Sequence, residues 1–194
     1  MKRENNHKYL LPLAMFYMTI KITTVLLIYK IVNIGGFTVS ASTIVIPLWF
    51  ITGDIIAEVY GYQIAKQVIW IVLICQFIFA GVCSSLIFLP SPSGWPLQGA
   101  YDHVLGNLPR VTLASFIAIT CGSFVNAYAI SRWKVLLQGK YFWMRSLGAS
   151  IVGETIFTLL AFSIEFFGIV PFNNVIHLVM ISLLAKIIIS PILL

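Results

Sequence analysis

Six long apolar runs, each about as long as a helix that crosses a bilayer, account for most of this 194-residue chain. Such a helix needs about 20 mostly apolar residues. The runs cover residues 10–32, 38–60, 67–89, 110–131, 145–168 and 173–194. Hydrophobic residues make up 60% of the chain and charged residues 9%, and a soluble core of this size could not hide that much apolar surface. We therefore predict an all-α polytopic membrane protein, with residues 1–194 forming a single domain of six transmembrane helices.

Basic residues mark alternate connections between the runs and so predict the orientation of the chain. The N-terminal tail, the second connection and the fourth connection carry Lys2, Arg3, Lys8, Lys66, Arg132, Lys134, Lys140 and Arg145. The other connections offer only Lys30 and Arg110. By the positive-inside rule, both termini are expected in the cytoplasm. The basic residues form no stripe that could follow a phosphate backbone, so nucleic acid is not expected as a partner.

Polar side chains recur at one depth of the membrane, although an ionisable group there costs about 3 kcal/mol or more. This layer contains Asp54 and Glu58 in the second run, Asn126 in the fourth, Glu154 in the fifth and Lys186 in the sixth. A central binding cavity requires such a layer, and a network that neutralises charge in the core would look the same. For Lys186 the open roles are a substrate contact, a proton-linked group and a counter-ion of Glu154 or Asp54.

The fifth run places Glu154, Thr158 and Glu165 on one helical stripe, because spacings of four and eleven return to nearly the same face. Glu154 is expected at a cavity, since no water otherwise reaches its depth. Glu165 lies close to the outer end and is expected to be exposed to water. Lys21, near the middle of the first run, and Lys30 are expected to extend along the helix toward the membrane surface.

Pro47 stands inside the second run, where it removes a backbone hydrogen bond. The polar segment TVSAST before it is expected to leave the start of this helix irregular. Irregular backbone at membrane depth is tolerated mainly where it lines a cavity. The proline thus favours a site beside the second run, although a kink without function is equally compatible.

Several classes of enzyme are excluded because their motifs are missing. The chain has no G-x-x-x-x-G-K-[ST], H-E-x-x-H or G-x-S-x-G sequence, and its three histidines lack ligand spacing. Asp54 and Glu58 could hold Mg²⁺ in a lipid-diphosphate transferase, but such a site needs more carboxylates and nearby basic residues. The sequence predicts a protein that is not an enzyme and that uses neither a cofactor nor a metal. A structural membrane scaffold remains an alternative.

Three stretches carry a resemblance to a known family. IPLWFITGDIIAEVYGYQIAKQVIW resembles the signature of the vitamin uptake transporter family, also called the queuosine precursor transporter family. RVTLASFIAITCGSFVNAYAISRWK and GKYFWMRSLGASIVGE resemble its fourth and fifth spans, and LLAKIIISPILL its sixth. The resemblance covers nearly the whole chain. It implies a six-helix protein of the bacterial inner membrane that imports 7-deazaguanine precursors of queuosine, with a fold similar to the small substrate-binding components of vitamin importers.

The chain departs from the family pattern in two places. Many members carry an aspartate three residues after the glutamate of the G-E motif, and Phe157 occupies that position here. This difference leaves the exact cargo open. The family usually continues past the sixth span into a basic tail, whereas this sequence ends at SPILL, so a shortened C-terminus is expected.

The chemistry of a 7-deazaguanine suggests roles for these residues. A carboxylate can accept both its N1–H and its exocyclic amine, so Glu154 is the candidate anchor, and Asn126 could donate to O6. An aromatic ring could stack on the flat base; the candidates are Trp49, Phe124, Phe157 and Trp143. A cationic aminomethyl base would favour Asp54 or Glu58, which would otherwise pair with Lys186.

The sequence therefore predicts a secondary or facilitated importer with its site between the second, fourth, fifth and sixth runs. The expected substrate-binding residues are Trp49, Asp54, Glu58, Asn126, Glu154, Phe157, Thr158 and Lys186. The expected partners are the small base and membrane lipid, and six helices per chain are compatible with a homodimer. The main alternative is a substrate-binding subunit, for a purine-like base or a vitamin, that works with a separate ATP-driven module.

Overall fold

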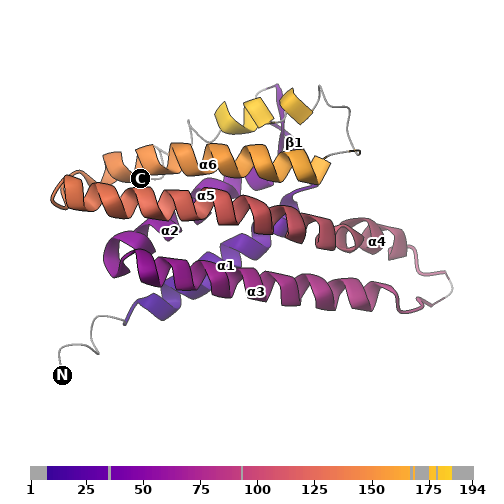
Figure 1. The fold of residues 1–194 in the computed structure, drawn as a ribbon. Coiled ribbons are helices and arrows are strands. Elements are labelled where there is room, and N and C mark those ends of the chain that lie inside the picture. The colour runs from indigo at the N-terminus through magenta and orange to yellow at the C-terminus, as the bar shows by residue number, and fades with distance from the viewer. Residues whose placement is uncertain are drawn as a thin grey trace.

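The computed structural model of the chain describes residues 8–34, 36–92, 94–166, 168, 175–177 and 179–184. Five helices in it are long and apolar enough to cross a membrane, counting α4 and α5 as one (Figure 1). They are α1 (Leu10–Leu27), α2 (Ser42–Tyr60), α3 (Tyr62–Ile87), α4 (Gln98–Gly106) with α5 (Leu108–Leu136), and α6 (Phe142–Phe166). These helices lie on five of the six predicted runs. The chain is an all-α polytopic membrane protein, as predicted.

The sixth predicted run, residues 173–194, falls largely outside the described residues. Within it, residues 175–177 and 179–184 are helical. Val175, Val179 and Ser182 are buried, and the Ser182 hydroxyl lies 3.1 Å from the hydroxyl of Thr43 in α2. The described part of this run therefore packs against the start of α2. Lys186 lies outside the described residues.

A two-stranded antiparallel hairpin, which the sequence analysis did not predict, joins α1 to α2. Strand β1 (Ile31–Ile34) pairs with β2 (Phe37–Ser40), with Ile31 opposite Ser40. The predicted first run extended to residue 32 and the second began at residue 38, so the helices end earlier and begin later than expected. The hydroxyl of Ser40 donates to the carbonyl of Ile28 at 2.6 Å, which ties the hairpin to the end of α1. The TVSAST segment, expected to leave the start of the second helix irregular, instead forms most of β2 and the first residues of a regular α2.

A single residue, Gly61, connects α2 to α3. Its dihedral angles are φ +84° and ψ +167°, a region that essentially only glycine occupies. Its N–H donates to the carbonyl of Ala57 at 3.0 Å, and its own carbonyl accepts from the N–H of Ala65 at 3.1 Å. The two helices are therefore joined without any loop.

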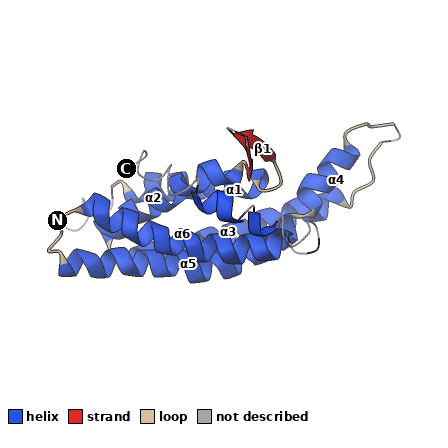
Figure 2. Ribbon diagram, turned by 90° about the horizontal axis from the view of Figure 1, so that it is seen from above, coloured by secondary structure: helices blue, strands red, loops and turns tan. Residues whose placement is uncertain are grey.

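The connections define two ends of the bundle. The N-terminal end of α1, the Gly61 link and the α5–α6 turn share one end, here called the basic end. The hairpin and α4 lie at the other, here called the hairpin end (Figures 1 and 2). Lys8, Lys66, Arg132, Lys134, Lys140 and Arg145 belong to the basic end. The short helix α4 lies in the connection between α3 and α5.

Helices α5 and α6 pack closely because glycines face one another between them. A Cβ atom built on Gly122 would lie 2.7 Å from the carbonyl oxygen of Gly153. A Cβ atom on Gly153 would lie 2.6 Å from the Cβ atom of Asn126. Real Cβ contacts are never so short, so both positions require glycine while the helices stay in contact. This seam brings the polar residues of α5 and α6 together.

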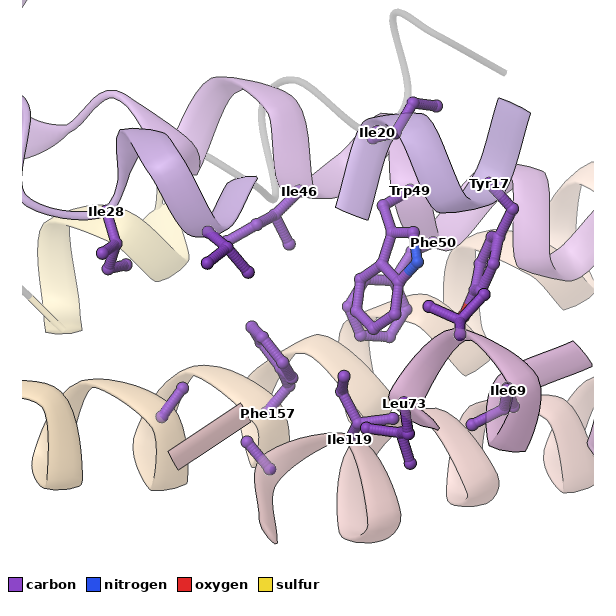
Figure 3. Packing of buried hydrophobic residues seen from close by; sticks show 14 of the residues in the cluster. Tyr17, Ile20, Ile28, Ile46, Trp49, Phe50, Ile69, Leu73, Ile119 and Phe157 are labelled. Atoms are coloured by element: carbon purple, nitrogen blue, oxygen red, sulfur yellow. The ribbon is translucent and has the colours of Figure 1, made fainter. Parts of the chain in front are cut away.

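The core between the two ends is aromatic and aliphatic. Figure 3 shows Trp49 and Phe50 between Ile46 on one side and Tyr17 on the other, with Phe157 facing them from α6. All five side chains are buried. This aromatic cluster lies where α1, α2 and α6 meet, and the polar side chains of the candidate site surround it.

Candidate functional site

Glu58 at the basic end is held in an ion-pair cluster. The Arg145 guanidinium donates to both of its carboxylate oxygens, at 2.8 and 3.0 Å. Lys134 lies 3.6 Å from the same carboxylate and donates to the Glu58 backbone carbonyl at 2.5 Å. Arg145 is only 1% exposed and also donates to the carbonyl of Lys140 at 2.9 Å. The counter-ions of Glu58 in the described structure are thus Arg145 and Lys134, which the sequence analysis treated only as orientation signals.

Asp54, one turn earlier in α2, is fully buried, and both of its carboxylate oxygens are occupied. One oxygen accepts from the side-chain amide of Asn126 in α5 at 2.5 Å. The other accepts from the hydroxyls of Ser146 and Ser150 in α6, the latter at 2.9 Å. Three neutral donors on two helices therefore solvate the carboxylate inside the bundle. The predicted closeness of Asp54 and Asn126 is confirmed.

An aromatic layer lies on the hairpin side of Asp54. The ring centroid of Trp49 is 5.3 Å from that of Tyr17, 5.1 Å from Phe50 and 5.6 Å from Phe157. The ammonium of Lys21 lies 5.0 Å from the Trp49 ring and 5.5 Å from the Phe157 ring, within the range of cation–π attraction. These rings fill the space between the helices at the centre of the bundle.

Lys21 does not extend to the membrane surface, contrary to expectation. It is 1% exposed, and its ammonium donates to the hydroxyl of Ser115 at 3.3 Å. The aromatic contacts and this hydroxyl hold it in the interior. Lys30, by contrast, is exposed at the end of the first run.

The α6 stripe is buried along its whole length. Glu154 is 3% exposed, Thr158 is fully buried and Glu165 is 2% exposed. The expectation that water reaches Glu165 is wrong, because the residues that follow α1 and the first turn of α5 cover this end of α6. The hydroxyl of Tyr29 donates to the Glu165 carbonyl at 3.4 Å. Arg110 donates to the carbonyl of Ile164 at 2.8 and 3.1 Å.

Two small cavities lie on opposite sides of the Trp49–Phe157 contact. The first, of about 20 Å³, has room for about one water molecule. It is lined by Tyr17, Trp49, Phe50, Gly53, Ile56, Ala65, Val68, Ile69, Ser123, Asn126 and Ala127. The second, of about 10 Å³, is lined by Lys21, Thr24, Val25, Ile28, Ser42, Ile46, Val111, Ser115, Phe157 and Glu165.

The first cavity combines buried polar atoms that have no hydrogen-bond partner in the described part of the chain. They are Nε1 of Trp49, Oγ of Ser123 and Oδ1 of Asn126. The three side chains are 1%, 5% and 4% exposed, respectively. The hydroxyl of Tyr17 lies near that of Ser123, but not in hydrogen-bond geometry.

The structure thus brings some of the predicted site residues together and separates others. Trp49 and Asn126 line the first cavity, Phe157 lines the second, and Glu154 and Thr158 lie beside the same seam without lining either. Asp54 and Glu58 are engaged with side chains of α5 and α6. Phe124 packs against Trp70 at 5.7 Å, and Trp143 is 58% exposed, so neither of these two rings is placed to stack on a ligand at the first cavity.

Tyr17, Ser123, Ser146 and Ser150 belong to this arrangement but were not predicted. A spacing of four relates Tyr17 to Lys21, and the same spacing relates Ser146, Ser150 and Glu154, so each set shares a helical face. That periodicity could have indicated them. Within the described residues, no group of three or more His, Cys, Asp and Glu side chains is arranged to hold a metal.

Comparison with known proteins places the chain in a family. Residues 40–194 match the family described as "Putative vitamin uptake transporter". Among curated proteins, the chain is 27% identical to the "Probable queuosine precursor transporter" of Bacillus subtilis (strain 168), over 84% of this chain and 72% of that protein. It is 26% identical to the "Queuosine precursor transporter" of Escherichia coli (strain K12), over 82% and 70% of the two chains. No solved structure matches the chain. The match over most of its length shows that this chain belongs to the vitamin uptake transporter family.

Proposed function

We propose that this chain imports a queuosine precursor, 7-cyano- or 7-aminomethyl-7-deazaguanine, by secondary or facilitated transport. The family match and the names of the relatives in Bacillus subtilis and Escherichia coli support this proposal. The structural observation that carries it is the central layer in which α2, α5 and α6 each contribute a buried polar side chain beside aromatic rings. Such a layer suits a flat base with several hydrogen-bonding atoms.

In this proposal the base binds in the half of the bundle nearer the basic end. Glu154 accepts hydrogen bonds from the base, and Trp49 or Phe157 covers one of its faces. Asp54 and Asn126 hold α2, α5 and α6 in register around it, and Thr158 and Lys186 complete the site. Glu58 acts through the Arg145 ion pair, which closes the basic end. Accumulation inside the cell follows from enzymatic consumption of the base, so transport needs no ion coupling.

We further propose that the protein lies in the bacterial inner membrane as one six-helix domain, with both termini in the cytoplasm. The concentration of lysine and arginine at the basic end supports this orientation. The apolar outer faces of α1 and α3 contact lipid and leave room for a second copy of the chain. The mass of the protein in nanodiscs measures its oligomeric state.

The test measures queuosine in tRNA from a bacterial strain that cannot make the precursor and lacks its own importer. The strain expresses the wild-type chain, Glu154→Gln or the control Asp102→Asn, and receives either base at nanomolar concentration. Both substitutions remove one carboxylate, but Glu154 is buried in the bundle whereas Asp102 is exposed on α4. We expect queuosine with the wild type and Asp102→Asn, and its loss with a membrane-inserted Glu154→Gln. Absence of queuosine with the inserted wild type would contradict the proposal.

A second measurement separates autonomous transport from the alternative of a subunit that needs an ATP-driven partner. Purified chain is reconstituted into vesicles without other proteins, and uptake of the labelled base is followed. We expect uptake. A chain that restores queuosine in cells but moves no base in these vesicles would be a partner-dependent subunit.

A further inference from the structure

The first cavity is lined by three residues that each have a buried polar atom without a partner in the described structure. Nε1 of Trp49 and Oδ1 of Asn126 make no hydrogen bond to any described residue, although both side chains are almost completely buried. An unpartnered buried polar atom destabilises a fold, because it has lost its hydrogen bonds to water and gained none in return. Folded proteins rarely keep such atoms without a reason. Two of them at one cavity, with the Ser123 hydroxyl beside them, form a place where a bound ligand can supply the missing partners.

The hydrogen-bonding character of two of the three atoms is fixed. Indole nitrogen can only donate. The amide of Asn126 donates through Nδ2 to the Asp54 carboxyl at 2.5 Å, which leaves Oδ1, an acceptor, without a partner among the described residues. Ser123 can do either. The cavity therefore offers one fixed donor and one fixed acceptor.

We propose that this cavity is the subsite that recognises the carbonyl edge of the base. Trp49 donates to O6, Asn126 accepts from the adjacent N1–H, and the Ser123 hydroxyl supports one of these bonds. The inference rests on the proposed function and assigns Asn126 the opposite role from the donor to O6 that the sequence suggested. The exocyclic amine of the base remains for Glu154, which follows Gly153, the α6 residue that contacts Asn126.

Space for the base comes from the groove between α1 and α3. The first cavity, at about 20 Å³, is far smaller than a bicyclic base. An apolar groove of about 420 Å³ runs between α1 and α3, and Val68 lines both the groove and the cavity. The groove and the cavity are thus separated by Val68, and separation of α1 from α3 along the groove enlarges the cavity.

The test compares two ligands and removes the donor from the protein. Equilibrium dialysis on the full chain in nanodiscs measures binding of 7-cyano-7-deazaguanine and of the same base without O6. We expect Trp49→Phe, which keeps a ring but loses the N–H, to weaken binding of the first base about tenfold. The base without O6 also lacks the N1–H, because its N1 becomes an acceptor, so it should bind the wild type at least about tenfold more weakly and should be almost indifferent to Trp49→Phe.

A serine pair provides the matched control. Ser123 and Ser131 are both in α5, and both hydroxyls lack a partner among the described residues, but only Ser123 lines the cavity. Ser123→Ala should weaken binding of the 7-cyano base several-fold while its thermal unfolding stays at or above that of the wild type. Ser131→Ala should leave binding unchanged.

Three results would overturn the inference. The first is equal binding of the two bases by the wild type, a measurement that does not depend on the folding of any variant. The second is an equal effect of Trp49→Phe on both bases, and the third is an equal effect of Ser123→Ala and Ser131→Ala on the 7-cyano base. With wild-type binding intact, each leaves the proposed import standing. If the wild type binds neither base, both the inference and the proposed substrate fail.

Discussion

The basic end and the centre of the bundle differ in whether their buried polar groups have hydrogen-bond or ion-pair partners. At the basic end Glu58 has two counter-ions, and Asp54 nearby accepts from three neutral donors. At the centre, Trp49 and Asn126 each present an atom with no partner in the described structure. The partnered groups near the basic end hold helices together, whereas the unpartnered atoms at the first cavity are available to a ligand. The contrast distinguishes contacts that maintain the fold from atoms that recognise cargo, and Asn126 contributes to both.

The largest expected effect on stability comes from removing the bidentate ion pair at the basic end. Arg145→Met leaves the Glu58 carboxylate without its bidentate partner and should lower the free energy of unfolding by about 3 kcal/mol. Lys134→Met is the control, because Lys134 is 43% exposed and 3.6 Å from the same carboxylate, so its loss should cost less than about 1 kcal/mol. Unfolding of the purified variants, followed by helical circular dichroism, measures both. Equal effects would show that Arg145 is no more than a surface charge.

The second prediction concerns Gly153, which joins the two regions. A methyl group there would meet the Cβ atom of Asn126 at 2.6 Å, and Asn126 serves Asp54 with one amide atom and the cavity with the other. Gly153→Ala should therefore lower stability by about 2 kcal/mol and also weaken binding of the base. Gly81→Ala in α3, where a Cβ atom meets nothing within 4 Å, should be neutral or stabilising. Similar unfolding temperatures for the two variants would contradict this account of the α5–α6 seam.

The smallest expected effects come from removing one serine hydroxyl in each region. Ser146→Ala removes a donor to the buried Asp54 carboxylate and should lower stability by about 1.5 kcal/mol. Ser123→Ala removes an unpartnered hydroxyl and should change stability by less than about 0.5 kcal/mol. Thermal unfolding of both variants, with base binding measured in parallel, should show opposite profiles: stability lost in the first and binding lost in the second. Identical profiles would remove the distinction between the regions.

The membrane helices were predictable because length and apolar composition suffice for them. The hairpin over residues 31–40 was not, since each of its strands has only four residues and they overlap the ends of the flanking runs. The polar residues before Pro47 indicated a break from helix there, but not that the chain would form a strand. Hydropathy therefore finds the spans but not where each helix stops.

The polar layer was predictable from depth, but its partnerships were not. Asp54 and Asn126 were expected at one level, and they are hydrogen-bonded. Arg145 was taken as an orientation signal, yet it is 1% exposed, because pairing with Glu58 needs a tertiary contact that no local pattern encodes. For Lys21 the reason is similar: Ser115 and the rings that surround it come from other helices.

The one-residue link at Gly61 limits how this protein can move. Sliding α2 along α3 by one helical turn would move it by about 5.4 Å. Adjacent Cα atoms are only about 3.8 Å apart, so a link of one residue is too short to allow this movement. Rotation about the backbone bonds of Gly61 is the motion that remains. The link therefore acts as a hinge at the basic end. The angle between α2 and α3 can change, and the distance between the two helices then changes most at the hairpin end.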